Sequence, residues 1–393
     1  MTPSAFAAMI AERYPASRLD HLHPGLCQYE PVRNELQGLV MRGGSLFTLE
    51  TIGTSVEGRL LSMISMGTGM RRVLLWSQMH GDEPTATLAL LDLLQMVLLH
   101  RDEEWVHAML RGISVWIVPL VNPDGAECRQ RRNSAGIDIN RDAHALATPE
   151  GKALHAACSR LRPEFGFNLH DQGLNSVGES QIPSAMALLA PAPSADRGTT
   201  STRLRAMRVG ALVSRILEPY AKGRITRYED AYEPRAYGET FQASGTSTLL
   251  IESGHWPGDP LKNHIRELNV IGILTALRSI ANGSHEDTEL DYYHRLPLNG
   301  KQMVDLLIRG VQLRHPSGWE HAVDIGVMFQ KSHDTVLIKD IGDLHTFGGL
   351  ETVDVTDRAI TTALLRVDAV MPTQQLFDAL QIYRPYPAIS FRP

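Results

Sequence analysis

The apolar positions of this chain fall into two kinds of segment, short runs of strand length and longer runs of helical length. Residues 73–76 and 248–251 are apolar without alternation, which is typical of strands covered on both faces. Strands are predicted at 46–51, 59–65, 73–76, 114–121, 164–169, 185–189 and 248–251, and helices at 6–13, 85–99, 149–161, 201–217 and 260–280. Strands that alternate with helices indicate an α/β domain, and ligands of such domains bind beyond the carboxyl ends of the strands.

The length of the chain indicates more than one domain. Its 393 residues exceed the roughly 250–300 residues at which one hydrophobic core usually stops growing. The pattern changes around 282–285, where a polar run is followed by shorter strand-like pieces separated by glycine-containing turns. We therefore expect a large domain over residues 1–284, with 1–45 as an entry arm that lacks clear periodicity after the helix predicted at 6–13, and a small β-rich domain over 285–393.

Composition and charge narrow the class of protein. The chain is 43% hydrophobic and 21% charged, as in ordinary globular proteins, and its formal net charge is −6 with no long basic block. These values argue against a nucleic-acid partner and against a membrane partner. Residues 1–15 show no secretory signal, although a processed chain would look the same. The cysteines, Cys27, Cys128 and Cys158, lack metal-finger spacing and fit a reducing compartment, so we expect a cytoplasmic protein.

The segment Met-His-Gly-Asp-Glu-Pro at 79–84 is the first candidate for chemistry. It places His80 and Glu83 on one short connection between a buried strand and a helix, with Gly81 expected to ease the turn. An imidazole and a carboxylate at a strand end are the ligand types that a catalytic zinc takes. The alternative is a surface histidine beside a glutamate that caps the helix.

Polar residues also stand at the ends of other predicted strands. His170 follows the strand at 164–169, Glu252 follows the strand at 248–251, and Asn-Pro-Asp-Gly at 122–125 follows the strand at 114–121. They converge if the sheet is open and twisted. Taken singly, His170 can be a buried histidine with its hydrogen bonds satisfied, and Glu252 can cap the next helix.

Four motifs in order resemble the zinc carboxypeptidases of the carboxypeptidase A type. They are Ile-Gly-Thr-Ser-Val-Glu-Gly-Arg at 52–59, His-Gly-Asp-Glu-Pro at 80–84, Asn-Pro-Asp-Gly at 122–125 and Asp-Ile-Asn-Arg at 138–141. The resemblance covers residues 46–282. It implies a mixed twisted sheet with helices on both faces, followed here by the small β-rich domain.

The resemblance also implies the catalytic centre. One zinc ion would be held by His80, Glu83 and His170, with a position left open for water, as catalytic zinc requires. The metal would activate the water and polarise the substrate carbonyl. Glu252 matches the general base that takes the proton from the water and passes it to the leaving amine. Asp138 matches the carboxylate that orients the imidazole of His80.

Further residues match the substrate contacts of the family. Arg131 stands nine residues before Asn140, the spacing of the arginine that stabilises the developing oxyanion, although Arg129 and Arg132 compete for that role. Asn140 and Arg141 match the pair that binds the terminal carboxylate of the substrate. The tyrosine that clamps the substrate has no clean match, and the candidates are Tyr237 and Tyr232.

Together these features predict a zinc-dependent metallopeptidase that hydrolyses a C-terminal peptide or peptide-like amide bond. Its substrate would be a peptide or peptide-like molecule with a free carboxylate. One alternative is an amidase or deacylase of related fold that acts on N-acyl amino acids or cell-wall peptides. Another is a zinc-binding module that keeps the fold and has lost catalysis. The sequence indicates no oligomeric state.

Overall fold

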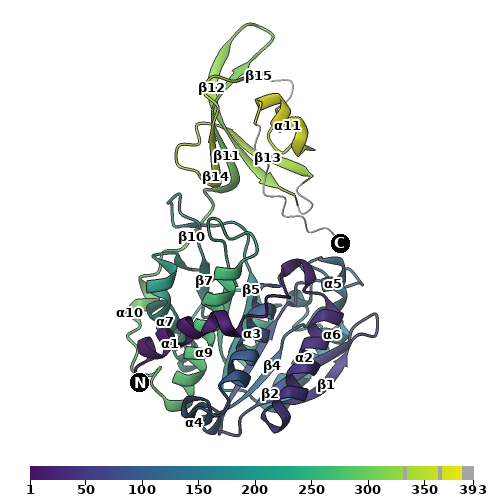
Figure 1. The fold of residues 1–393 in the computed structure, drawn as a ribbon, viewed down its shortest axis with the longest axis vertical. Coiled ribbons are helices and arrows are strands. Elements are labelled where there is room, and N and C mark those ends of the chain that lie inside the picture. Colours follow the sequence, from purple (N-terminus) through teal and green to yellow (C-terminus); the bar gives the residue numbers. More distant parts are fainter. Residues whose placement is uncertain (331–333, 362–364, 383–393) are drawn as a thin grey trace. The chain divides into compact units, whose positions relative to one another are not determined.

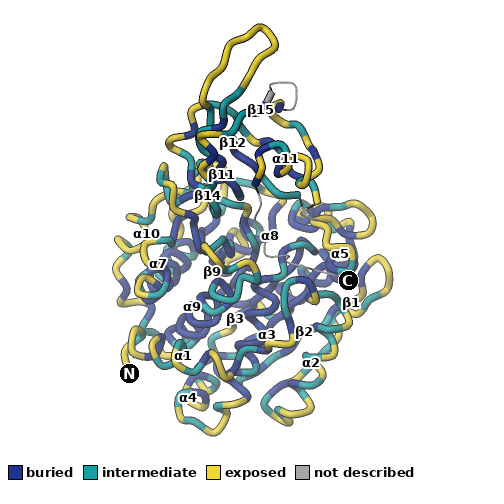
Figure 2. Tube along the Cα trace, turned by 45° about the horizontal axis from the view of Figure 1, so that its top comes forward, coloured by how far each residue is buried: buried dark blue, intermediate teal, exposed yellow. Residues whose placement is uncertain are grey.

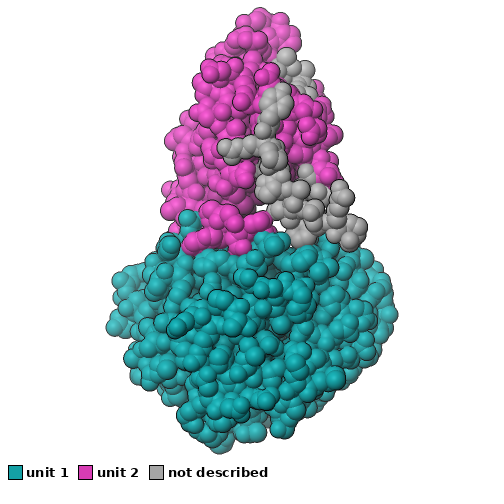
Figure 3. Space-filling model, in the orientation of Figure 1, with its two compact units in different colours: residues 1–172, 185–253, 261–297 teal, residues 173–184, 254–260, 298–393 magenta. Residues whose placement is uncertain are grey.

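A computed structural model describes residues 1–330, 334–361 and 365–382, and its chain divides into two compact units (Figure 3). The first unit comprises 1–172, 185–253 and 261–297, and the second comprises 173–184, 254–260 and 298–393. The expected boundary lay near residue 285. In the structure the first unit continues to Pro297, and the second unit takes up two short segments from within the first.

The first unit is built around a mixed sheet (Figure 1). Within the described residues its order is β1-β2-β4-β3-β5-β9-β7-β8. The strands are β1 (Thr48–Thr54), β2 (Leu60–Met66), β3 (Arg71–Ser77), β4 (Ile113–Val118), β5 (Phe165–Asp171), β7 (Met186–Leu189), β8 (Ile225–Arg227) and β9 (Ser247–Ser253). The four central strands β4, β3, β5 and β9 run parallel to one another, whereas β1, β2 and β7 pair antiparallel with their neighbours. The predicted mixed α/β fold is confirmed.

Helices cover both faces of this sheet. Successive residues of a strand point to opposite faces, and Val73 to Ser77 of β3 are all buried, so neither face is open to solvent there (Figure 2). On one face Leu74 and Trp76 pack with residues of α6 and α8 in a shared apolar cluster. The helices α3 and α7 each pack against α9, and all three pack against the central strands. The helices of the unit are α1 (Pro3–Ser17), α2 (Tyr29–Gly43), α3 (Thr85–Leu99), α4 (Glu104–Gly112), α5 (Pro123–Cys128), α6 (Pro149–Leu161), α7 (Ser201–Ala221), α8 (Tyr237–Ala243), α9 (Asn263–Asn282) and α10 (Asp291–His294).

The entry arm differs from its prediction. The prediction of an arm without periodicity is wrong for residues 29–43. These residues form α2, which buries Val32, Leu36 and Leu39. Those three positions lie four and three residues apart, so they share one face of a helix. The exposed polar residues between them and the nearby prolines obscure this short apolar stripe.

The second unit is β-rich, as predicted. Its described strands form a sheet in the order β14-β11-β12-β13-β16, with β15 also paired to β11. The strands are β11 (Met303–Arg314), β12 (Glu320–Phe329), β13 (Thr335–Gly342), β14 (Gly348–Asp354), β15 (Ala359–Thr361) and β16 (Val370–Pro372). Helix α11 (Thr373–Leu380) buries Leu376, Phe377 and Leu380 in the apolar core of this sheet. A separate short pair joins β6 (Ser176–Val177) to β10 (Asn299–Gly300).

No helix in the described part of the chain combines the length and the apolar character that crossing a membrane requires.

Candidate metal centre

Three parallel strands bring the candidate residues to one edge of the sheet. Strands β3, β5 and β9 are neighbours, so their carboxyl ends meet at the same edge. His170 lies in β5 and is paired in register with Glu252 of β9. His80 follows β3 after a tight turn. Residues that are 82 positions apart in the sequence, His170 and Glu252, therefore become direct neighbours.

The turn after β3 depends on two unusual backbone positions. Gln78, not Gly81, has the positive φ of 51° that reverses the chain, and its side-chain amide donates to the Gly81 carbonyl at 3.1 Å. Gly81 is needed for another reason. A Cβ atom there would lie 2.0 Å from the backbone carbon of Gly125, so only glycine allows this approach. The expectation that Gly81 eases the turn is therefore wrong, because Gln78 has the unusual φ and Gly81 allows the close approach to Gly125.

His80, Glu83 and His170 form one compact, buried cluster. His80 Nδ1 lies 2.7 Å from Glu83 Oε1, and His170 Nδ1 lies 2.8 Å from Glu83 Oε2. The potential ligand atoms of the three side chains all lie within 4.8 Å of one another. Two imidazole nitrogens and a carboxylate are the donor set of catalytic zinc sites with three protein ligands. The cluster therefore fits a zinc ion in donor type, in number and in convergence.

A second layer of side chains holds the two imidazoles. Asp138 Oδ1 lies 3.2 Å from Nε2 of His80, which leaves Nδ1 of that ring facing Glu83. Asn140 Nδ2 lies 3.4 Å from Nε2 of His170. Such outer partners fix the tautomer and the orientation of a ligating imidazole. The structure thus places Asp138 beside His80, and its role there stays a prediction.

The three candidate arginines separate in space. Arg131 reaches the cluster, with Nη1 3.1 Å from His80 Nδ1 and Nε donating to Asp138 Oδ2 at 3.0 Å. Arg129 instead donates to the Gly25 carbonyl on the entry arm. Arg132 donates to the Gly136 carbonyl at 3.1 Å within its own loop. Of the three, Arg131 is the one that the fold brings to the metal cluster.

Asn140 and Arg141 occupy different environments. Asn140 is buried, and its Oδ1 accepts from the backbone N–H of Tyr237 at 3.0 Å. Arg141 is partly exposed, and its Nη1 donates to the Asn140 carbonyl at 2.7 Å. The Arg141 guanidinium also lies 3.3 Å from Glu233 through Nε, and its partial exposure lets a ligand reach it, whereas the amide of Asn140 is engaged within the protein.

Tyr237 does not face this site. Its side chain is fully buried in the apolar cluster with Trp76 and Phe241, so the predicted contact with substrate is corrected. Tyr228, which is 36% exposed, is the alternative candidate for the contact with substrate. Burial raises the pKa of Tyr228, and so do the nearby carboxylates of Glu252 and Glu83. No local pattern marks Tyr228, because its approach depends on the path of the loop that follows β8.

The charges of the cluster influence one another strongly. Burial alone would raise the pKa of Glu83, but the imidazoles of His170 and His80 hold it well below its usual range. Burial lowers the pKa of His170. Burial opposes the charged form of His80 too, yet hydrogen bonds to Asp138 and Glu83 raise its pKa to about 9. Burial and the carboxylates of Glu83 and Asp171 raise the pKa of Glu252 to about 8. A divalent cation among these groups would favour the ionised carboxylates.

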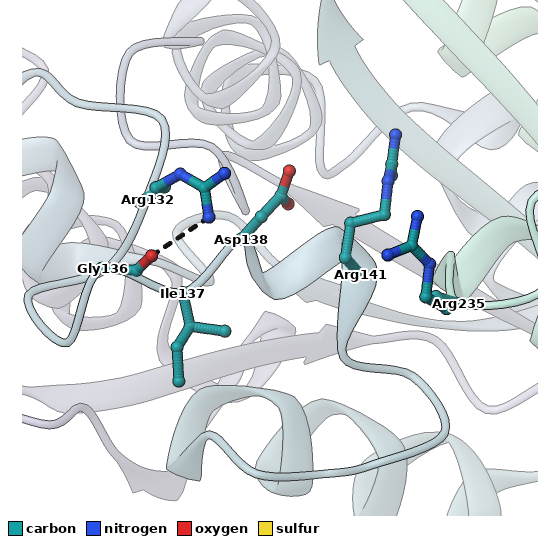
Figure 4. Close-up of a pocket in the computed structure, with 6 residues that line it drawn as sticks. All are labelled: Arg132, Gly136, Ile137, Asp138, Arg141 and Arg235. Atoms are coloured by element: carbon teal, nitrogen blue, oxygen red, sulfur yellow. Dashed lines mark hydrogen bonds between the residues drawn. The ribbon is translucent and has the colours of Figure 1, made fainter.

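A cavity of about 400 Å³ opens beside the cluster (Figure 4). Three arginines line it, Arg132, Arg141 and Arg235, and we call them the arginine basin. Asp138 also lines the cavity and so connects it to the metal cluster through its contact with His80. Asp138 and Arg141 had been assigned roles from the sequence, whereas Arg235 had not, because no motif marks it.

Comparison with known proteins shows which proteins this domain resembles. Residues 32–184 match the family model described as zinc carboxypeptidase. Carboxypeptidase E of Caenorhabditis elegans is 36% identical over 117 residues, which is 24% of this chain and 25% of that protein. A probable carboxypeptidase 2 of Trichophyton verrucosum is 28% identical over 103 residues, or 26% of this chain and 20% of that protein. The chain spans about a fifth of the length of the first curated relatives that it matches.

Solved structures share the fold. Bovine thrombin-activatable fibrinolysis inhibitor superposes with a TM-score of 0.54 at 15% identity, covering 66% of this chain and 97% of that one. A metallo-carboxypeptidase from Burkholderia cenocepacia superposes with a TM-score of 0.51 at 17% identity, covering 65% and 68%. The resemblance to the zinc carboxypeptidases is confirmed. The family match contains all three residues of the metal cluster and ends before Glu252.

Proposed function

From this metallocarboxypeptidase-type domain we propose that the protein is a zinc-dependent metallopeptidase that hydrolyses a C-terminal peptide or peptide-like amide bond. The observation that carries the proposal is the convergence of His80, Glu83 and His170 at one sheet edge, with Glu252 beside them in register. Three protein ligands leave a further coordination position open, which distinguishes a catalytic zinc from a structural one.

The zinc ion would be held by His80 Nδ1, His170 Nδ1 and the Glu83 carboxylate. When bound, it supplies a Lewis acid that polarises a carbonyl and lowers the pKa of water to near neutrality. Asp138 holds the imidazole of His80 in the tautomer and orientation that ligation needs.

The other residues of the site bind the substrate and move protons. Glu252 accepts the proton of the attacking water and passes it to the leaving amine. The Arg131 guanidinium, which is partly exposed and held by Asp138, donates hydrogen bonds to the oxyanion as it develops. Arg141 binds the terminal carboxylate of the substrate through charge-assisted hydrogen bonds. This contact makes removal of a C-terminal residue the expected mode of action.

Replacing Glu252 by glutamine tests this assignment. Glu252→Gln keeps the size of the side chain but removes the base, so we expect zinc content to stay stoichiometric and turnover to fall at least about 100-fold. A matched control is Glu164→Gln. Glu164 is exposed and lies just before β5, at the end of that strand opposite to His170. Unchanged turnover in the Glu252 variant would remove the base assignment. Absence of zinc, together with no hydrolysis on addition of divalent metals, would remove the enzymatic proposal.

Peptides with free and amidated carboxyl termini separate the proposed activity from that of an amidase or deacylase. The proposed contact of Arg141 with a terminal carboxylate predicts cleavage of the free form only. Equal cleavage of both forms would contradict exopeptidase action and favour the amidase or deacylase alternative.

A further inference from the structure

The arginine basin is a built feature rather than a chance group of flexible side chains. Two hydrogen bonds connect the segment 233–237 to residues 140–143, one between backbone groups and one to a side chain. Ala143 N donates to the Arg235 carbonyl at 3.1 Å, and Tyr237 N donates to Asn140 Oδ1 at 3.0 Å. These bonds hold Arg235 beside Arg141 independently of what their side chains bind.

The third arginine is positioned by its own loop. Asn133 N donates to the Ile137 carbonyl at 3.0 Å, and Gly136 N donates to the Asn133 carbonyl at 2.9 Å. Arg132 Nη1 donates to the Gly136 carbonyl, which is the sole polar partner of its guanidinium within the described chain. Figure 4 shows Arg132 on the opposite side of Asp138 from Arg141 and Arg235. Its positive charge is therefore available to a ligand in the cavity.

The basin already binds one carboxylate of the protein itself, that of Glu233. Glu233 Oε2 lies 2.7 Å from Arg235 Nη2 and 3.3 Å from Arg141 Nε, so two guanidiniums share it. Glu233 Oε1 accepts from Arg235 Nε at 2.8 Å, which completes a bidentate pair. The hydrogen bonds from Arg235 hold the pKa of Glu233 well below its usual value, and the charge of Arg141 lowers it further.

The balance of charge leaves room for more than one anion. Arg131 pairs with Asp138 at 3.0 Å and with Glu83 at 3.5 Å, so the three guanidiniums of the basin face one further carboxylate, that of Glu233. Two positive charges remain uncompensated, in a protein whose formal net charge is −6. A cavity with an excess of one sign of charge attracts ligands of the opposite sign. The terminal carboxylate of the proposed substrate accounts for one of the two charges.

We propose that the arginine basin binds a second carboxylate of the substrate, so that preferred substrates carry an acidic side chain at or next to the C-terminal residue. This inference rests on the proposed peptidase function and specifies its substrate class. Arg141 binds the terminal carboxylate, and Arg132 with Arg235 binds the second one. Guanidinium groups suit this task because they bind carboxylates in a planar, bidentate manner.

Three peptides that differ at their last two residues test the proposal with the zinc-loaded protein. One ends in Gln-Gln, one in Gln-Glu and one in Glu-Gln, so the two acidic peptides locate the second carboxylate. We expect kcat/KM for one of the acidic peptides to exceed that of the neutral peptide about tenfold or more, which is about 1.4 kcal/mol. The preference should weaken at high ionic strength, because salt screens exposed charges.

Arg132→Gln, Arg235→Gln and the double variant identify the residues responsible. We expect the acidic preference to fall in each single variant and to approach unity in the double variant, with Arg→Lys exchanges restoring it in part. Arg160→Gln is the control, since Arg160 is an exposed arginine of α6 that pairs with Glu50 at 2.6 Å and is not among the residues that line the cavity. Thermal melting and zinc content of every variant establish that it is folded and loaded.

Two results would overturn the inference. One is an active enzyme that cleaves the neutral peptide as fast as both acidic peptides, and the other is an acidic preference that survives in the double variant. Calorimetry with zinc-loaded Glu252→Gln gives an independent measurement, with N-acetylglutamate and N-acetylglutamine as probes. Tighter binding of the glutamate probe that depends on Arg132 and Arg235 supports the basin even if no peptide is hydrolysed. Absence of hydrolysis alone would therefore contradict the proposed function and not the basin.

Discussion

The metal cluster and the arginine basin adjoin one another through Asp138 but are constructed in opposite ways. His80, Glu83 and His170 are buried, lie at strand ends and are joined by hydrogen bonds of 2.7 and 2.8 Å. The basin is lined by partly or fully exposed arginines that come from loops and from a short 3₁₀ turn. We therefore expect the cluster to keep one arrangement and the basin to exchange one carboxylate for another.

This difference assigns a task to each region. A metal site needs ligands that are held in place before the ion arrives, because reorganising buried charged groups is costly. A substrate pocket instead needs groups that remain partly hydrated and can exchange one ion-pair partner for another. Arg141 and Arg235, which pair with Glu233 in the structure, are groups of this kind. We therefore expect substitutions in the cluster to abolish function and substitutions in the basin to change selectivity.

Glu83→Gln should have the largest effect. Glu83 is the carboxylate that both imidazoles face, so the amide would remove one ligand and leave the two rings without their shared acceptor. We expect loss of stoichiometric zinc and a fall in kcat/KM of about a thousandfold or more. Zinc can be measured by atomic absorption on protein dialysed against buffer with trace metal. A variant with full zinc content and wild-type activity would contradict the ligand assignment.

The contrast between residues at strand ends and residues on loops also explains which parts of the molecule could be predicted from the sequence. The α/β fold and the convergence of His80, Glu83, His170 and Glu252 were predictable, because apolar runs mark the buried strands and parallel strands end at one edge. Periodicity was a weaker guide in the entry arm, where α2 buries a narrow apolar stripe between exposed residues.

The loop-built parts of the site were not predictable in the same way. Tyr237 was a reasonable candidate by its place before Glu252, yet its side chain is buried with Trp76 and Phe241. Tyr228 and Arg235 lie on the same connection between β8 and α8, where no periodic pattern exists. Their positions depend on long-range backbone contacts, such as the bond from Ala143 N to the Arg235 carbonyl. Such contacts leave no signal in the local sequence.

Exchanging the two tyrosines for phenylalanine tests this correction. Tyr228 is partly exposed near Glu252 and Glu83, so its hydroxyl can donate to a bound substrate. We expect Tyr228→Phe to lower kcat/KM about tenfold, the effect of losing one hydrogen bond to a charged group. Tyr237→Phe is the matched control. The Tyr237 hydroxyl is buried without a partner in the described structure, so its removal should preserve activity and leave the melting temperature equal or higher. The opposite order of effects would restore Tyr237 as the substrate contact.

The smallest expected effect concerns Glu239, which lies in the first turn of α8 and is 9% exposed. Burial raises the pKa of Glu239 to about 7 from its ordinary value of 4.5, so the folded protein retains a proton that the unfolded chain releases. Stability should therefore fall as the pH rises from about 4.5 to about 7 and should not fall further from this cause above it.

Glu239→Gln removes this titration while keeping the size of the side chain. We expect the variant to be more stable than the wild type by about 1–3 kcal/mol at pH 8 and by much less at pH 5, as each unit of pKa shift corresponds to about 1.4 kcal/mol. Urea unfolding of both proteins at the two pH values measures the difference directly. An equal change at pH 5 and pH 8 would show that packing around α8, rather than the charge of Glu239, determines the effect. A loss of stability at pH 8 would instead show that the ionised carboxylate is stabilised by Arg141, and that the positive charge of the basin extends into the buried side of the site.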